Sequence, residues 1–562
     1  MTIGDDESRE RTEKSVARSS LIMAAGTFTS RALGMVRSPI LLTMVIGLNN
    51  PIANAFDIAN TLPNILFGVI ASGLINAVLV PAIVSASQQG SDGGAAYINK
   101  IITLAVLALG GITLVLTLAA PLVVKAFAAT MARDWYEITV YFAYWCIPQL
   151  FFYGLYAVLG QILNARENFG PYMWVPVANN VVAIGGLLLL LSLFGTPTVE
   201  QTHLVTVWQG ARGTILAAFA TGGIVVQALL LFIPLRRLGI RFRPDFHWRG
   251  VGLKATGKAS LWALATTLTG MIPLTLVTNV AAGATQRALS AGADTTLVAG
   301  NAAHSVAYTL VYLPISLFAL SIVTAVYTKM AEAGARRDFA FLRSQAVSTA
   351  NVVAVFNFLC IALFIVFARP LARIFVPTGT DAEVYSLAVV IMCFCAATIG
   401  KGIGLVYSRV CYSLAATRTV FLAGLVPLAF EIVAYPLCGF LPPRFTVPAI
   451  ALAASIDSLI FAVVLIMMVR RMLGSVGARR LISSHLRLVV ATAVTCAIGV
   501  GALWLIGYAR VAANVGIAVV TVVLGGIAVS AVFVAMLKLV RLPEWGQVAS
   551  RVGSLLQRFK RR

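Results

Sequence analysis

Long apolar runs recur along almost the whole chain, from Ser20 nearly to the C-terminus, and short segments rich in charged residues separate them. A helix crosses a bilayer with about 20 apolar residues, so this pattern predicts fourteen membrane-spanning helices and leaves no room for a soluble domain. We therefore expect an all-α polytopic membrane protein. The predicted spans lie near residues 18 to 46, 63 to 86, 101 to 124, 138 to 163, 173 to 194, 213 to 235, 257 to 283, 298 to 327, 347 to 367, 384 to 407, 420 to 440, 447 to 469, 487 to 507 and 512 to 537.

Composition agrees with this pattern. Of the 562 residues, 59% are hydrophobic and only 11% are charged. Soluble domains carry about 25% charged residues, so this chain cannot cover itself with a water-soluble surface.

The net charge of +22 follows the predicted topology. With the N-terminus in the cytoplasm, 31 Lys and Arg fall in inside segments and 8 in outside loops, and the remaining three lie within spans. The positive-inside rule then places both termini in the cytoplasm of a multi-pass cell-membrane protein. Contact with anionic phospholipid headgroups accounts for the basic charge, and no nucleic acid partner is expected.

Cysteine, histidine and catalytic motifs give no sign of an enzyme. The seven cysteines lie in apolar stretches and the four histidines are scattered, so we expect no disulfide frame and no metal site. No nucleotide-binding loop or nucleophile motif is present, and we predict that the protein is not an enzyme and has no cofactor other than a coupling ion. Uphill transport would then draw on an ion gradient or on the membrane potential.

Two short sequence matches suggest an internal repeat of six spans. Leu62-Pro63 followed by Leu66-Phe67 recurs as Leu313-Pro314 followed by Leu317-Phe318, and Ser20-Leu21 is echoed by Ser260-Leu261. Two six-helix lobes of the same orientation would permit alternating access to a site between them. The predicted divisions are a tail at 1–17, an N-lobe at 18–235, a basic linker at 236–256, a C-lobe at 257–469, two further helices at 470–537 and a basic tail at 538–562.

Ionisable residues inside spans are the first candidates for function, because each costs about 2.5 to 3.5 kcal/mol to insert. Six residues qualify. They are Arg31, Arg37, Asp57, Lys401, Glu431 and Asp457.

Arg31 and Arg37 share one long segment with Gly34 and Pro39, which predicts a broken helix near the middle of the membrane. The planar guanidinium suits phosphate oxygens, so the pair is a candidate site for an anionic headgroup. Two structural alternatives are that Arg37 reaches a membrane interface and that it pairs with Asp57.

Glu431 and Asp457 lie near the centres of adjacent predicted helices. Two carboxylates there could hold Na⁺ or carry a proton, which makes Glu431, Asp457 and Lys401 candidates for ion coupling. A plain ion pair with Lys401 is the competing interpretation.

The motif Ser30-Arg31-Ala32-Leu33-Gly34-Met35-Val36-Arg37, followed by Asn54-Ala55-Phe56, Leu62-Pro63-Asn64 and Val80-Pro81, resembles the opening of the MurJ (MviN) family of lipid II flippases. That family belongs to the multidrug/oligosaccharidyl-lipid/polysaccharide exporter superfamily. The similarity extends through the chain, including fourteen helices and two extra helices at the C-terminal end.

The resemblance implies transport of an undecaprenyl-pyrophosphate-linked disaccharide-pentapeptide from the inner to the outer leaflet of a bacterial cell membrane, for peptidoglycan synthesis and cell shape. Arg31 and Arg37 match the arginines of the family's first helix, and Asp57, Asn64 and Ser72 complete the expected substrate-binding set. Proteins of cell-wall synthesis and division are the expected protein partners.

The chain departs from the family pattern at four places that carry charge; two of them are Ser38, in place of an acid, and a position near Thr309, in place of an arginine. Ile65 to Gly68 stand where arginines are common, and Ser72 stands in place of an acid. The alternatives are a flippase for polysaccharide lipids or a drug/cation antiporter of the same superfamily, and a scaffold of the cell-wall machinery that transports nothing.

Overall fold

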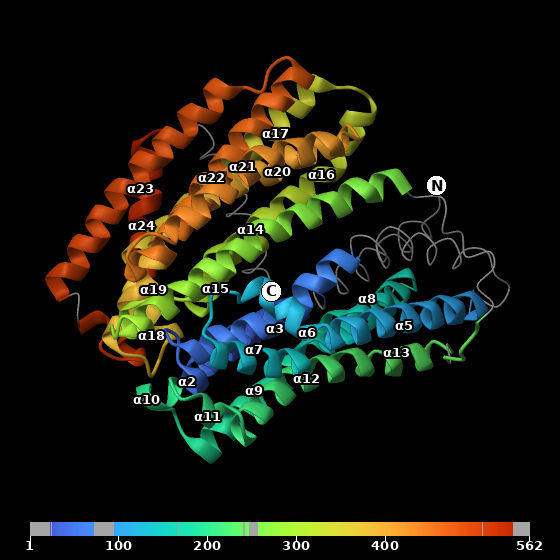
Figure 1. The fold of residues 1–562 in the computed structure, drawn as a ribbon. Helices are drawn as coiled ribbons and strands as arrows, with labels where there is room; N and C mark the ends of the chain where they lie inside the picture. Colours follow the sequence, from blue (N-terminus) through green and yellow to red (C-terminus); the bar gives the residue numbers. More distant parts are fainter. Residues whose placement is uncertain are drawn as a thin grey trace, which may run out of the picture. The chain divides into compact units, whose positions relative to one another are not determined.

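The computed structural model describes residues 23, 25–71, 95–166, 168–239, 242–246, 257–507 and 510–542, and these are helical with no strand. The chain divides into two compact units, Met1–Met271 and Ile272–Arg562. The division falls inside α14, Gly257–Ser290. Each unit is a bundle of long helices joined by short connections (Figure 1).

In the first unit, the described elements with defined bounds before α14 follow an α-helical stretch at residues 25–35. They are η1 Val36–Leu42, α2 Thr43–Ile46, α3 Pro51–Ile70, α5 Ala95–Leu118, α6 Ala120–Phe127, α7 Arg133–Cys146, α8 Gln149–Ala165, α9 Phe169–Phe194, α10 Val199–Thr202, α11 Val205–Trp208, α12 Ala211–Leu230 and α13 Phe232–Arg237.

The second unit continues from α14 to the C-terminal helices. Its elements are η3 Thr295–Leu297, α15 Asn301–Pro314, η4 Ile315–Ala319, α16 Leu320–Ala335, α17 Phe339–Val366, α18 Ala368–Phe375, α19 Asp381–Phe394, α20 Ala397–Ser413, α21 Thr417–Cys438, α22 Pro443–Leu473, α23 Ala478–Ile506, η5 Arg510–Ala512 and α24 Val515–Leu539.

Among the described residues, twelve helical segments are long and apolar enough to cross a membrane. They correspond in order to the third through fourteenth predicted spans. The first two predicted spans extend into residues 18–22 and 72–86, which lie outside the described ranges, so the total of fourteen stays a prediction. The expected all-α polytopic membrane fold is confirmed.

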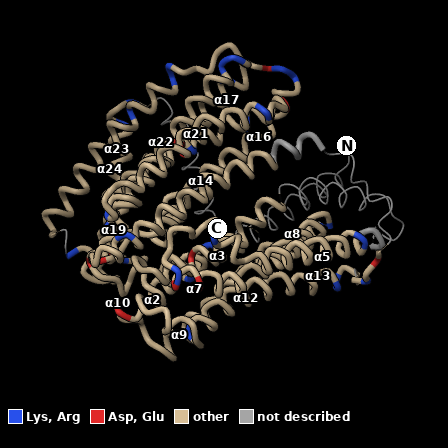
Figure 2. The backbone as a smooth tube through the Cα atoms, viewed as in Figure 1, with Lys and Arg blue, Asp and Glu red and all other residues tan. Residues whose placement is uncertain are grey.

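Charge and burial follow the pattern expected of membrane helices. Lys and Arg gather mainly at helix ends and in connections, for example between α16 and α17 (Figure 2).

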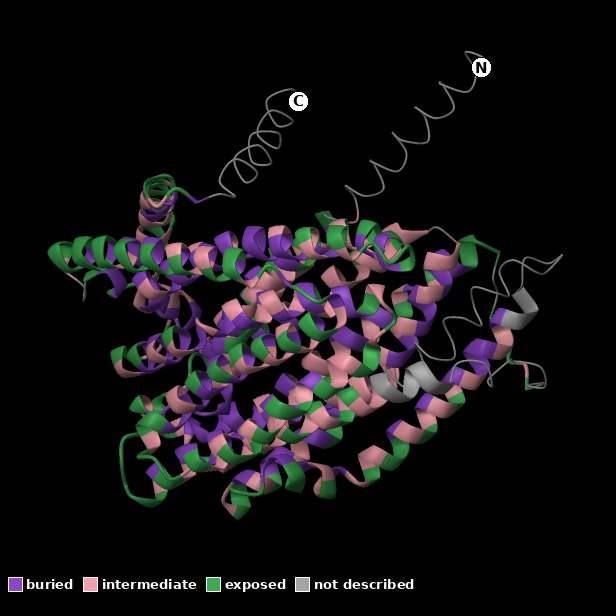
Figure 3. Ribbon diagram, turned by 90° about the horizontal axis from the view of Figure 1, so that it is seen from above, coloured by how far each residue is buried: buried purple, intermediate pink, exposed green. Residues whose placement is uncertain are grey.

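Many helices are buried on one face and exposed on the other (Figure 3). The exposed faces are themselves apolar, and on α23 they include Leu486 and Trp504, which are 62% and 73% exposed. Large apolar surfaces of this kind are suited to contact with lipid.

Helix lengths repeat between the two units. Three pairs have equal lengths: α6 and α18 have 8 residues, α7 and α19 have 14, and α8 and α20 have 17. Their first residues are separated by one constant offset of 248 residues, as Arg133 and Asp381 show, and the offset also relates Phe169 of α9 to Thr417 of α21. The six-span repeat is therefore present in the structure over its third to fifth spans.

Small residues allow close helix packing within each unit. A Cβ added to Gly223 of α12 would lie 2.4 Å from Asn179 Oδ1 of α9, and one added to Gly400 of α20 would lie 2.3 Å from the backbone of Ser458 on α22. Helices in membranes associate through such small-residue contacts, because apolar burial alone offers no gain over lipid.

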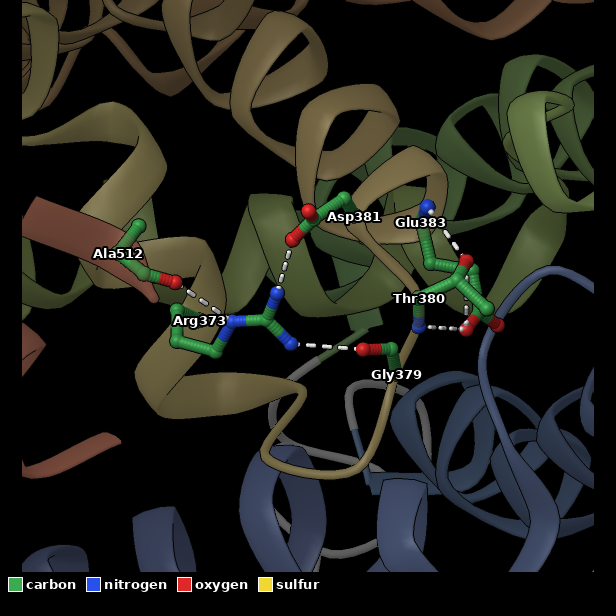
Figure 4. A network of polar contacts seen from close by, with 6 residues as sticks. All are labelled: Arg373, Gly379, Thr380, Asp381, Glu383 and Ala512. Carbon is green, nitrogen blue, oxygen red and sulfur yellow. Dashed lines mark hydrogen bonds and ion pairs between the residues drawn. The ribbon is translucent and has the colours of Figure 1, made fainter. Parts of the chain in front are cut away.

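A buried arginine ties α18 to the connection between the last two helices (Figure 4). Arg373 donates from Nε to the carbonyl oxygen of Ala512 at 2.9 Å and from Nη1 to the carbonyl oxygen of Gly379 at 2.6 Å. Its third nitrogen pairs with Asp381. Next to this cluster, Thr380 and Glu383 form a reciprocal cap on the first turn of α19. The helices α23 and α24 are thus anchored to the rest of the second unit.

Candidate functional site

The helix that carries Arg31 and Arg37 is continuous rather than broken. It is α-helical over residues 25–35, becomes a π-helix over Val36–Leu42 and returns to α-helix until Ile46. Pro39 lies inside the π segment, where the wider turn accommodates a residue that has no backbone N–H. The expected break is therefore wrong in form, although the distortion occurs where the sequence indicates it. Arg37 lies within the distorted segment.

Arg37 lines a pocket between helices of the first unit. About 510 Å³ of space there is not filled by protein atoms, a volume that includes open solvent. Its polar lining consists of Arg37 and Ser38 from η1, Asn60 from α3 and Tyr153 from α8, and its apolar lining comes mostly from α9 and α12. A half-buried guanidinium facing an otherwise largely apolar space favours an anionic ligand, because an ionised group there is stabilised by an opposite charge.

The guanidinium of Arg37 is positioned from α9. Its Nη1 donates to Asn179 Oδ1 at 3.5 Å, a long contact, and Asn179 Nδ2 in turn donates to Gln227 Oε1 of α12 at 2.9 Å. Among the described residues, the polar partner of Arg37 is therefore a neutral amide and not Asp57. A guanidinium with a neutral partner keeps its full charge for a ligand.

The next residue of α9 holds the same helix at a second point. Asn180 Nδ2 donates to the carbonyl oxygen of Ser30 at 2.8 Å, one residue before Arg31. Two consecutive asparagines of α9 thus reach the helix that carries the two arginines, at Ser30 and at Arg37.

Gln149 is a second buried polar side chain near the pocket, next to the lining residue Asn60. Gln149 begins α8 directly after the interruption at Ile147–Pro148, and its side chain is fully buried. It donates to Thr221 Oγ1 at 2.9 Å and lies 3.5 Å from Asn60 Oδ1. Its own Oε1 is buried without a hydrogen-bond partner. An interrupted span with free polar groups is typical of binding sites in transporters.

The other predicted substrate-binding residues are placed differently. Arg31 and Asp57 are half-buried and each has a polar or electrostatic partner, but neither lines the pocket. Asn64 is exposed on α3. Ser72 lies outside the described residues. The structure therefore brings only Arg37 of the predicted set into this pocket, and the roles of the others stay predictions.

The three ion-coupling candidates come together in the second unit. Lys401, Glu431 and Asp457 project from α20, α21 and α22, and their charges are close enough to interact. Tyr435 Oη donates to Glu431 Oε1 at 2.9 Å. Within the described part of the chain, neither carboxylate forms an ion pair with Lys401 within 4.0 Å. The plain ion-pair interpretation is therefore not what the geometry supports.

Aromatic side chains surround one side of this cluster. His304, Tyr308 and Tyr312 lie one turn apart along α15, and Tyr308 stacks on Tyr312 with ring centroids 4.1 Å apart. Phe394 of α19 contacts all three rings. Tyr312 is also within electrostatic reach of both carboxylates.

The neutral polar residues around Arg37 were not predicted from the sequence. They are Asn60, Tyr153, Asn179 and Gln227, and neither charge within a span nor the family motif indicates them. A signal was available, since amide side chains in apolar helices are costly to bury and need partners.

The chain matches the model of the protein family described as "Lipid II flippase MurJ" over residues 45–523. Among solved structures, "Lipid II flippase MurJ, inward closed conformation" superposes with a TM-score of 0.67 at 18% identity, covering 92% of this chain and 99% of that one. An inward-facing multidrug resistance transporter of the MATE family and MOP superfamily gives 0.58 at 13% identity, covering 80% and 98%.

Proteins described as probable lipid II flippases are also similar to this chain in sequence. The "Probable lipid II flippase MurJ" of Rickettsia prowazekii is 26% identical over 41% of this chain and 42% of its own length, and that of Vibrio cholerae is 27% identical over 43% and 44%. The chain thus spans less than half the length of these two relatives. The protein of the same description from Borreliella burgdorferi is 20% identical over 79% and 82%.

The structure defines a polytopic helical membrane protein whose fold resembles those of the MurJ and MATE structures. Because the family model covers most of the chain, the protein belongs to the MurJ family of lipid II flippases.

Proposed function

We propose that this protein translocates lipid II, an undecaprenyl-pyrophosphate-linked disaccharide-pentapeptide, from the inner to the outer leaflet by alternating access. One observation carries the proposal: a guanidinium, that of Arg37, faces a pocket formed by membrane helices and has a neutral side chain as its polar partner. Family membership and the described relatives supply the identity of the cargo.

The chemistry of the pocket suits one end of such a lipid. A guanidinium donates two parallel hydrogen bonds to phosphate oxygens, and Asn60, Ser38 and Tyr153 offer further donors around it. The apolar walls from α9 and α12 lower the local dielectric, which would strengthen the attraction between guanidinium and phosphate. Arg31 and Asp57, which lie in the first unit with Arg37, would act as further contacts for the headgroup.

Orientation, partners and energy source complete the proposal. Both termini face the cytoplasm of a bacterial cell membrane, supported by 31 basic residues inside against 8 outside. Phospholipid surrounds the helices, and proteins of cell-wall synthesis and division are the expected partners. Transport is driven by the membrane potential or by an ion gradient acting at Glu431, Asp457 and Lys401, and no chemical step on the cargo is needed.

The test measures lipid II on the outer face of cells depleted of their own flippase and supplied with variants of this protein. We expect Arg37→Gln to lower outer-face lipid II to the level of depleted cells. Arg37→Lys should keep part of the activity, because the charge remains while the two-pronged geometry is lost. Arg133→Gln is the matched control, since Arg133 is 88% exposed and pairs with Glu137 on the first turn of α7.

Wild-type levels of exposed lipid II in the Arg37→Gln strain, with Arg133→Gln also normal, would contradict the role of the pocket. Equal membrane levels of all variants must be shown by immunoblot. A purified protein that binds a drug but not lipid II would instead support the antiporter alternative.

A further inference from the structure

The membrane helix α15 exposes polar rather than aliphatic side chains. Its two exposed residues are Tyr308, which is 47% exposed, and Thr309. On α24, by contrast, the exposed residues between Gly516 and Leu537 are all apolar. A hydroxyl group that faces lipid tails has no hydrogen-bond partner there, and this is costly. The exposed face of α15 is therefore suited to a polar partner and not to hydrocarbon.

Three rings follow one another along this face of α15. The ring of Tyr308 is inclined by 20° to that of His304 and by 27° to that of Tyr312, and the ring centroids are 6.3 and 4.1 Å apart. The buried Phe394 of α19 meets both tyrosine rings nearly at right angles, at 77° and 78°. We call His304, Tyr308 and Tyr312 the aromatic row. Its rings are held in place by contacts within the second unit, so a ligand would meet a preorganised surface.

The polar atoms of this face are not used inside the protein. Within the part of the chain that the structure describes, the hydroxyl groups of Tyr308, Tyr312 and Thr309 and the imidazole of His304 form no hydrogen bond, and none of these atoms is shut off from solvent. Hydroxyl groups in membrane helices commonly bond back to their own helix, as that of Ser316 does to the carbonyl oxygen of Leu313 at 2.8 Å. Four polar side chains on one face are thus free to bind a ligand.

This combination of groups suits a sugar ring. A pyranose has flat faces made of C–H bonds, which stack on aromatic rings, and hydroxyl groups at its rim, which need donors and acceptors. A hydrocarbon chain would leave the four polar side chains of this face unpaired. A phosphate would find no Lys or Arg among them. An organic cation could contact the ring faces but would not use the hydroxyl groups.

We propose that the aromatic row and Thr309 form a sugar-binding site, in which Tyr308 stacks on a pyranose face and the free hydroxyl groups bind the rim of the sugar. That the sugar is the disaccharide of the lipid-linked cargo rests on the proposed function. The Arg37 pocket of the first unit suits the pyrophosphate, and the aromatic row suits the uncharged part of the same headgroup. Under the proposed orientation, α15 forms the outer half of the membrane-spanning segment Thr295–Ala335, so this site would serve the sugar on its way to the outer face.

The experiment is saturation-transfer NMR on the purified full-length protein in lipid nanodiscs, because many detergents carry sugar headgroups that would compete. The probe is the soluble disaccharide of N-acetylglucosamine and N-acetylmuramic acid, which has neither lipid nor pyrophosphate. We expect saturation to pass from the protein to the sugar ring protons, and a titration of this signal gives the affinity.

Variants of Tyr308 test the stacking contact. Tyr308→Leu keeps an apolar side chain but removes the ring, and it should lower the affinity for the disaccharide about two- to tenfold. Tyr308→Phe keeps the ring and should retain most of the affinity. Tyr385→Leu is the matched control, because Tyr385 of α19 is 58% exposed and lies outside the aromatic row. That variant should bind as the wild type does.

Several outcomes would overturn the proposal. They are no transfer to the disaccharide in the wild type, equal affinities in Tyr308→Leu and Tyr385→Leu, and an equal loss in Tyr308→Leu and Tyr308→Phe. Binding of tetraphenylphosphonium that depends on Tyr308, without binding of the disaccharide, would assign the row to organic cations. If Tyr308→Leu does not fold, Thr309→Val tests the hydroxyl contact, and an unchanged affinity would contradict it.

Failure of this proposal can be distinguished from failure of the proposed function, because the soluble disaccharide is not a substrate for flipping. Disaccharide binding that depends on Tyr308, in a protein that exposes no lipid II on the outer face of cells, would support the sugar site and reject the flipping. Normal exposure of lipid II without disaccharide binding would do the reverse.

Discussion

Asn179 donates from Nδ2 to Oε1 of Gln227 at 2.9 Å, and this bond decides which end of the Asn179 amide faces Arg37. With the NH₂ group engaged, the carbonyl oxygen Oδ1 is presented to the guanidinium. Gln227 on α12 therefore orients a residue on α9 that in turn orients a residue on η1. Three spans distant in sequence act together on one cation.

Removing this bond should weaken anion binding without removing any charge. We expect Gln227→Leu to reduce the affinity for undecaprenyl pyrophosphate about fivefold, because the loss of one hydrogen bond costs about 1 kcal/mol. Gln227→Glu should also lower the affinity, because its carboxylate still accepts from Asn179 but brings a negative charge close to the anion site. Gln209→Leu in the exposed connection before α12 is the control. Unchanged affinity in Gln227→Leu would show that Asn179 holds its orientation without α12.

Adjacent glycines of α12 offer a matched pair for the packing of α9 against α12. A Cβ at Gly223 would lie 2.4 Å from Asn179 Oδ1 and 2.7 Å from the Asn179 carbonyl oxygen, whereas a Cβ at Gly222 meets nothing within 4 Å. We expect Gly223→Ala to destabilise the protein by about 1 to 3 kcal/mol. Gly222→Ala should be neutral or stabilising by up to about 1 kcal/mol, because alanine is the better helix former. Thermal unfolding in detergent measures both, and equal melting temperatures would refute close packing at Gly223.

The sequence was sufficient to predict the helices but not their side-chain contacts. Hydropathy alone located the twelve described spans, because each helix must satisfy its own backbone and present apolar side chains to lipid. The contact between Arg37 and Asn179 joins residues 142 positions apart, and no local pattern indicates it. It depends on how α9 lies against η1, which many small packing contacts decide together.

The internal repeat also could not be aligned from the sequence alone. The two sequence matches have offsets of 240 and 251 residues, while the helices from α5 to α9 repeat in α17 to α21 at 248. Short apolar matches cannot fix a register, but helix ends can, because breaks such as Ile147–Pro148 and Cys395–Ala396 mark equivalent points. The equivalence of Tyr153 and Lys401 follows only from that register.

Of the eight predicted site residues, four lie in the two sites described above. They are Arg37, Lys401, Glu431 and Asp457.

Arg373 should be essential for holding the last two helices to the second unit. In Arg373→Ala, the carbonyl groups of Gly379 and Ala512 lose their donor, and each buried acceptor without a partner costs about 1 to 3 kcal/mol. We expect a destabilisation of at least about 2 kcal/mol. Arg373→Lys should recover little, because one ammonium cannot reach three acceptors in a plane. Arg444→Ala is the control, since exposed Arg444 rests only on the Phe445 ring. Chemical denaturation in detergent distinguishes them, and equal stabilities would contradict the anchoring role.

The proposed orientation predicts opposite labelling of two exposed connections. The segment between α9 and α12 contains exposed Glu200, and the connection between α16 and α17 contains exposed Arg336. In intact cells, a membrane-impermeant thiol reagent should label Glu200→Cys, and it should reach Arg336→Cys only after the membrane is permeabilised, because positive charge is retained on the cytoplasmic side. The seven native cysteines are buried or half-buried, so background labelling should be low. Labelling of Arg336→Cys in intact cells, with Glu200→Cys protected, would invert the topology and with it the direction of lipid II transport.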